Sequence, residues 1–173
     1  MQRAEKTIEE TSALSTEQKK ELVKGIIESL NANGEADPDE QKQIRKEAPE
    51  TRVKLIDLNG DGIPEVIAQA TGNYFCGVTG NCFLWIFSRV GDHYKVLLQA
   101  VGIQGFTVQK TRSFGFHDLV LTRHESALSS DLFFYSFSKG GYHEKACYEA
   151  SWVRMVGDER VELKDPVITP CGR

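Results

Sequence analysis

The chain has 173 residues, of which 40% are hydrophobic and 27% are charged. This composition suits one globular domain of ordinary size and rules out wholesale disorder and a fibrous chain. The formal net charge of −4 argues against a nucleic-acid-binding protein held by phosphate contacts. Apolar runs are only a handful of residues long, far short of the roughly 20 that a spanning helix requires, so we expect no transmembrane segment.

Composition divides the chain at about residue 50. Every Cys, His, Trp, Phe and Tyr lies after this point, whereas residues 1–50 hold 8 Lys and Arg against 12 Asp and Glu. We therefore expect a helical N-terminal segment over 1–50 and a β-rich domain with the main core over 51–173.

Two helices are predicted in the first segment. The first opens with the S-x-x-Q form of the capping box at Ser15 and Gln18 and continues with apolar residues at a spacing of four along one face. The second opens at Asp37-Pro38, a cap followed by proline, and ends near Lys46. We expect these helices to pack one face on the domain; an amphipathic arm that binds a partner is the alternative.

The next hundred residues are typical of short β-strands separated by Gly-bearing turns. The expected strands are 53–56, 65–69, 82–88, 93–100, 108–110, 117–123, 131–138 and 142–148. The second four resemble the first, since Phe87-Ser88-Arg89 recurs as Phe137-Ser138-Lys139 at an offset of 50, and about four strands in such a period is typical of a propeller blade. We predict an α+β fold: N-terminal helices packed on an antiparallel β region of two blade-like (propeller-type) four-stranded units, about 51–100 and 101–150. A tail over 151–173 follows.

The most specific motif is the loop Asp57-Leu58-Asn59-Gly60-Asp61-Gly62-Ile63-Pro64-Glu65. Oxygen-bearing side chains stand at its positions 1, 3, 5 and 9, glycine at position 6 permits a sharp bend, and the carbonyl at position 7 can add a backbone ligand. Ca²⁺ is a hard cation that binds about 6–8 oxygen ligands in a tight cage, so these oxygens predict a calcium site. An EF-hand is excluded, because its position 12 needs a bidentate Glu where this chain has Ala68 and because strands flank the loop. A tight turn without metal is the alternative.

The loop resembles the calcium loop of FG-GAP (integrin-type) and VCBS-like repeats, in which D-x-[ND]-x-D-G-x-x-[DE] joins two strands of a blade. The resemblance is close over about residues 53–70 and departs from the commoner pattern in ending on Glu. It implies one Ca²⁺ held by Asp57, Asn59, Asp61, the backbone of Ile63, and Glu65. The aligned stretch of the second unit, 110–118, has lost most of the carboxylates and gained two basic residues, so we expect no calcium there.

The four cysteines stand at Cys76, Cys82, Cys147 and Cys171. Four cysteines allow three connectivities, of which 76–82 with 147–171 is the most local. Their spacing fits neither common zinc sites nor a C-x-x-C redox motif. A disulfide framework implies export, so we predict a periplasmic or secreted protein in its mature form, although no apolar signal segment follows Met1. Buried free thiols in a cytosolic protein are the alternative.

No catalytic signature is found, and we assign no catalytic residue. Tyr74 and Phe75 precede the Cys76 loop, where a cross-link would hold them as a rigid contact surface for a partner. The predicted function is therefore an exported, calcium-stabilised, disulfide-bonded binding module without catalytic activity, similar in design to an inhibitor or immunity-type protein of the bacterial envelope. The expected partner is another protein or an envelope polymer. An envelope hydrolase with an unrecognised active site is the alternative, and one module of a longer repeat protein is a third.

Overall fold

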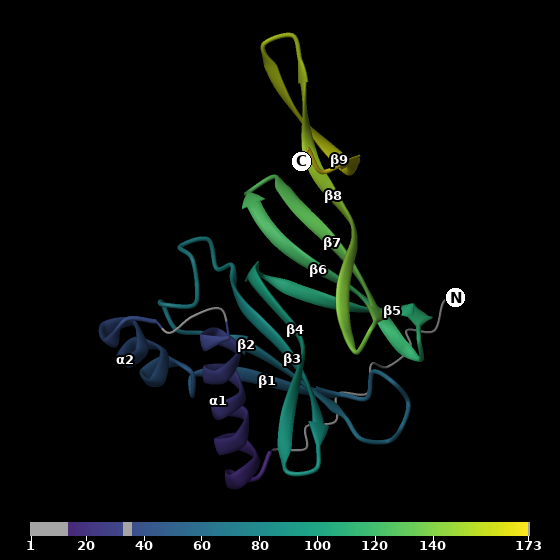
Figure 1. The fold of residues 1–173 in the computed structure, drawn as a ribbon. Coiled ribbons are helices and arrows are strands. Elements are labelled where there is room, and N and C mark those ends of the chain that lie inside the picture. Colours follow the sequence, from purple (N-terminus) through teal and green to yellow (C-terminus); the bar gives the residue numbers. More distant parts are fainter. Residues whose placement is uncertain (1–13, 33–35, 173) are drawn as a thin grey trace.

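The computed structural model describes residues 14–32 and 36–172 of the chain (Figure 1). Helix α1 (Thr16–Asn31) begins at the predicted capping box: the N–H of Gln18 donates to the Ser15 hydroxyl, and the N–H of Ser15 donates to the Gln18 side chain. Helix α2 (Pro38–Glu47) begins where Asp37 accepts hydrogen bonds from the first free N–H groups. Both predicted helix starts are confirmed.

The first sheet is an antiparallel meander of β1 (Thr51–Ile56), β2 (Glu65–Ala70), β3 (Cys82–Val90) and β4 (His93–Ile103), with neighbours in chain order. Five of the six residues of β2 are buried, because the sheet is covered on both faces. Alternate residues of a strand point to opposite faces. Val66 and Ala68 therefore join the core under the helices, whereas Ile67 joins the core on the other face.

The helices cover one face of this sheet. Leu22 and Ile26 of α1 and Ile44 of α2 are buried in one cluster with Trp85 and Phe87 of β3. A side chain at Gly25 would come within 3.3 Å of the Phe87 ring, so α1 approaches the sheet closely where it carries only hydrogen. The expected packing of the helices on the β region is confirmed.

The second sheet covers the other face. It is an antiparallel meander of five strands: β5 (Gly105–Ser113), β6 (Phe116–Ser126), β7 (Ser129–Ser138), β8 (Gly141–Val156) and β9 (Glu159–Pro170). Leu119 and Leu121 of β6 and Tyr142 of β8 pack against Leu84 and Ile86 of β3. The molecule therefore has three layers, with the first sheet between the helices and the curled second sheet (Figure 1).

The α+β class and the antiparallel pairing are confirmed, but the boundaries of the second unit are not. Within 151–173, predicted as a tail, residues 151–156 instead form the end of β8 and residues 159–170 form β9, a hairpin that projects beyond the rest of the second sheet (yellow in Figure 1). The second sheet thus has five strands where four were predicted. The relation of the two sheets to propeller blades remains a prediction.

Candidate calcium loop and binding loop

The loop 57–65 connects β1 to β2 and is closed by its own side chains. The Asp57 carboxylate accepts hydrogen bonds from the N–H groups of Gly60 (2.7 Å) and Gly62 (2.9 Å). Asp61 accepts one from Ile63 at 2.7 Å. Gly60 and Gly62 have φ of 80° and 84°, conformations that side chains disfavour, which accounts for both glycines. Burial opposes ionisation of Asp57, but the N–H bonds from Gly62 and Gly60 outweigh it and lower its pKa.

Glu65 ends the loop inside the protein. Its residue is 2% exposed, and one carboxylate oxygen accepts a hydrogen bond from the N–H of Leu58 at 2.8 Å. The pKa of Glu65 is raised from 4.5 to about 7, mainly by burial; the hydrogen bond from Leu58 opposes this rise, and the negative charges of Asp61 and Asp57 add to it. Three acidic side chains therefore share one turn, and the innermost has no cation paired with it among the described residues.

The corresponding stretch of the second unit lies against this loop. The N–H of His117 donates to the Leu58 carbonyl at 2.8 Å. Arg112 donates to the Gly115 carbonyl at 2.7 Å, and its guanidinium reaches within 3.7 Å of the point where Gly60 would carry a Cβ. One of the two basic residues that distinguish the second unit thus stands beside the acidic loop of the first.

Among the described residues, Asp131, Cys147 and Cys171 are the one group whose acidic, thiol or imidazole ligand atoms gather within 4.8 Å. Cys147 and Cys171 are bonded to each other, so neither offers a thiolate to a metal. The loop 57–65 is not part of that group, and its ligand set remains a prediction.

A second loop, formed by residues 76–82, is fixed by a disulfide between its two ends and by backbone hydrogen bonds within it. The Cys76–Cys82 disulfide closes it, as the most local connectivity predicts, and two backbone hydrogen bonds cross it, from Gly77 to the Asn81 carbonyl (2.8 Å) and from Gly80 to Gly77 (3.0 Å). We name this segment the bridged loop.

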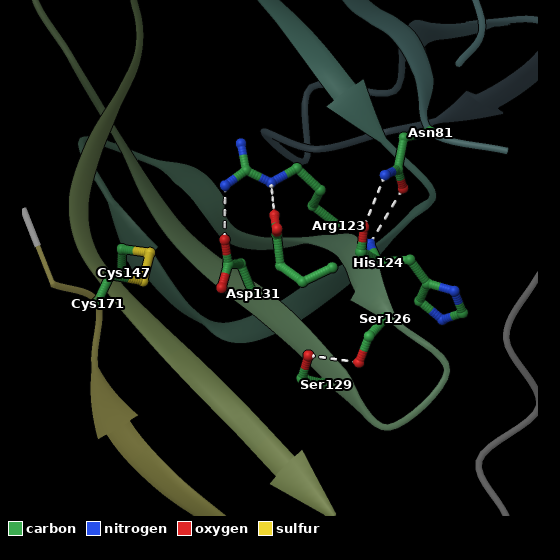
Figure 2. A network of polar contacts seen from close by, with 9 residues as sticks. Asn81, Arg123, His124, Ser126, Ser129, Asp131, Cys147 and Cys171 are labelled. Carbon is green, nitrogen blue, oxygen red and sulfur yellow. Dashed lines mark hydrogen bonds and ion pairs between the residues drawn. A yellow bond between two sulfur atoms is a disulfide. The ribbon is translucent and has the colours of Figure 1, made fainter. Parts of the chain in front are cut away.

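Asn81 anchors the bridged loop to the second sheet (Figure 2). Its side-chain nitrogen donates to the carbonyl of His124 at 2.8 Å, and its side-chain oxygen accepts from the N–H of His124 at 3.0 Å. Sequence reasoning missed this contact, because an asparagine in a Gly-rich turn carries no sign of a partner 43 residues away.

Of the two residues predicted as a contact surface, one is buried, and the tip of the bridged loop exposes a third residue that was not predicted. Phe75 is 3% exposed and packs edge-on against Phe83 and Trp85, so its predicted role as a partner contact is wrong. Tyr74 is 39% exposed, and its hydroxyl donates to Glu40 at 2.7 Å. Val78, at the tip, has its whole side chain in solvent. A β-branched apolar side chain in that position is the feature that sequence reasoning overlooked.

Next to the bridged loop, Arg123 joins two carboxylates (Figure 2). Its Nη2 donates to Asp131 at 2.6 Å, its Nε lies 2.6 Å from Glu125, and its guanidinium stands over the Phe133 ring. One cation thus engages both carboxylates and links β6 to β7.

The second disulfide, Cys147–Cys171, ties β8 to the end of β9 beside this network (Figure 2). The predicted pairing of all four cysteines is therefore the one found.

Comparison of the chain with protein-family models, with curated proteins and with solved structures finds no match.

Proposed function

We propose that this protein is an exported binding module without catalytic activity, which contacts a protein partner through the bridged loop. The observation that carries the proposal is a fully exposed Val78 on a loop closed by a disulfide and anchored by Asn81. A loop that is already rigid loses little conformational entropy on binding. A convex apolar tip fits a concave apolar pocket, which favours a protein over a polymer strand as partner.

Export is supported by the two disulfides, which persist in oxidising compartments. Over the described part of the chain, neither helix combines the length and the apolar character that crossing a bilayer requires. A rigid projecting loop best suits an inhibitor or immunity-type protein, so this is the form of binding module that we propose.

The alternative is an envelope hydrolase, and glycoside hydrolases, one class of these, use a pair of carboxylates that exchange protons across a cleft. The two that the fold brings together at this end, Glu125 and Asp131, are both held by Arg123. This arrangement favours the binding module.

We also propose that the loop 57–65 binds one Ca²⁺ through Asp57, Asn59, Asp61, the Ile63 carbonyl and Glu65. The oxygen spacing, the buried charge of Glu65 and the position between the first two strands of a four-stranded meander support the proposal. The role of the ion would be to hold the turn and to compensate the buried carboxylate.

The calcium proposal is tested by thermal unfolding in millimolar Ca²⁺ and in EDTA, without reductant. At about 100 times Kd, an ion that binds only the folded state adds roughly 2.7 kcal/mol. Asp61→Ala should remove this increment, and Asp158→Ala, in the distant β8–β9 turn, should retain it. An identical melting temperature in both buffers would refute the site.

The bridged loop is tested by photo-crosslinking from position 78 and, as a matched control, from Val90, an exposed valine at the end of β3. Crosslinking in the exported fraction of the producing cell should yield a protein adduct from position 78 that position 90 does not give. Once the partner is identified, Val78→Asp should weaken its binding to this protein at least tenfold, because burying a valine contributes about 1.5 kcal/mol or more. Equal adducts from both positions would contradict the proposal.

A further inference from the structure

A small pocket lies where the first turn of α1 meets the end of the loop 57–65 and the β3–β4 hairpin. It measures about 170 Å³. Its apolar walls are Leu14, Leu55, Ile63, Pro64 and Val66. The buried residues of α1 begin only at Leu22, so the polar first turn leaves this end of the sheet partly uncovered.

Three polar side chains complete the lining: Gln18, Arg89 and Tyr94. Arg89 and Tyr94 are directly opposite each other on β3 and β4. Burial raises the pKa of Tyr94, and the positive charge of Arg89 opposes that rise, as it does when the two groups are close. The Tyr94 hydroxyl has no hydrogen-bond partner within the described residues.

The Arg89 guanidinium has capacity for an anion. Its Nε donates to the Gly91 carbonyl at 3.0 Å, and the one carboxylate paired with it among the described residues, Asp92, lies 4.0 Å away on a side chain that is 96% exposed. An ion pair this long and this solvated contributes little. A planar guanidinium beside a phenol hydroxyl, both at the rim of an apolar pocket, is suited to a carboxylate.

We propose that this pocket binds an aliphatic carboxylate, with the chain against Leu55 and Val66 and the carboxylate on Arg89 and Tyr94. An apolar cavity of about 150 Å³ accommodates benzene, so the pocket takes one branched chain of roughly six carbons. A free acid and the C-terminal leucine of a polypeptide share this chemistry. The inference is independent of the function proposed for the bridged loop.

The test is an NMR titration of the full ¹⁵N-labelled chain with 4-methylpentanoate and with its neutral amide. The acid should produce saturable shifts centred on the lining residues, with a Kd on the order of 1 mM, and the amide should bind at least about tenfold more weakly. Arg89→Gln should remove the preference for the acid, and Tyr94→Phe should reduce it. Arg154→Gln, an exposed arginine on the distant β8 hairpin, should leave it intact.

Titration with acetyl-Ala-Leu and with its amide shows whether the bound carboxylate comes from a free acid or from the C-terminus of a polypeptide. Tighter binding of the peptide acid than of 4-methylpentanoate identifies a polypeptide C-terminus, and weaker binding identifies a free acid. Equal affinity for acid and amide, an unchanged preference in folded Arg89→Gln, or no saturable shift up to about 20 mM would overturn the proposal.

Discussion

Replacing Glu65 by glutamine isolates the free-energy cost of burying its charge. The amide retains the size of the side chain, and its oxygen can still accept the hydrogen bond from the N–H of Leu58. The negative charge, which burial and the neighbours Asp61 and Asp57 disfavour, is removed.

The magnitude follows from the pKa of Glu65, which rises from 4.5 to about 7 on folding. Below pH 4.5 the carboxyl is protonated in both states, and its burial carries no charge penalty. Between pH 4.5 and pH 7 the unfolded state ionises this carboxyl while the folded state keeps it protonated. The free energy of unfolding of the wild-type protein should therefore fall by about 3 kcal/mol across this window, at roughly 1.4 kcal/mol per pKa unit, and become level above it.

Urea unfolding in EDTA, at intervals from pH 5 to pH 8.5, measures this difference. Glu65→Gln should be more stable than the wild-type protein by about 3 kcal/mol at the upper end, and the advantage should shrink toward pH 5. Glu159→Gln, at an exposed glutamate at the start of β9, should follow the wild-type profile throughout.

Parallel profiles for Glu65→Gln and the wild-type protein would refute the reasoning, because they would mean that the carboxylate is buried at no cost without a cation. A variant that is less stable at every pH would contradict it equally. With Ca²⁺ added, the difference in free energy of unfolding between the two proteins at pH 8 should shrink or change sign, because glutamine is a poorer Ca²⁺ ligand than glutamate.

Three further predictions concern the surroundings of the two loops. Arg112→Ala removes a cation from beside the acidic loop and should raise Ca²⁺ affinity about threefold by calorimetry, and an unchanged affinity would show that the guanidinium is too well screened to matter. Cys76→Ala with Cys82→Ala should cost about 2 kcal/mol and speed hydrogen exchange within the bridged loop; unaltered exchange would show that the backbone and Asn81 suffice. Gly72→Ala places a methyl group on the Glu47 carboxylate and should cost about 2 kcal/mol in urea unfolding, and a neutral substitution would show that this carboxylate moves freely.

Local signals predicted much of the fold. The caps at Ser15 and Asp37 depend on side chains within three residues of the helix start, and both are found. The last strand was missed because Lys164, Asp165 and Pro166 are typical of a tail. They are tolerated here because residues 163–166 lie at a register shift in the pairing of β8 with β9, between Glu162 and Val167, so Pro166 takes no place in the paired ladder. The charged residues also discourage further pairing at this edge strand.

The candidate sites show where sequence reasoning stops. The loop 57–65 could be predicted as a candidate site because all its side chains come from one short segment, whereas the contact between Asn81 and His124 depends on the packing of two sheets. The error at Phe75 has the same origin. Whether an aromatic residue next to a cysteine is exposed is decided by Phe83 and Trp85, which β3 brings over it.

The central position of the first sheet makes the two halves of the chain interdependent. Gln104 alone separates β4 from β5, yet cutting there would leave Ile67, Leu84 and Ile86 without the layer that covers them. Neither half buries its apolar face by itself, so the molecule should melt in a single cooperative transition, and separately produced halves should fold only when mixed. The two halves therefore resemble each other in their strand pattern, but neither half is expected to be stable without the other.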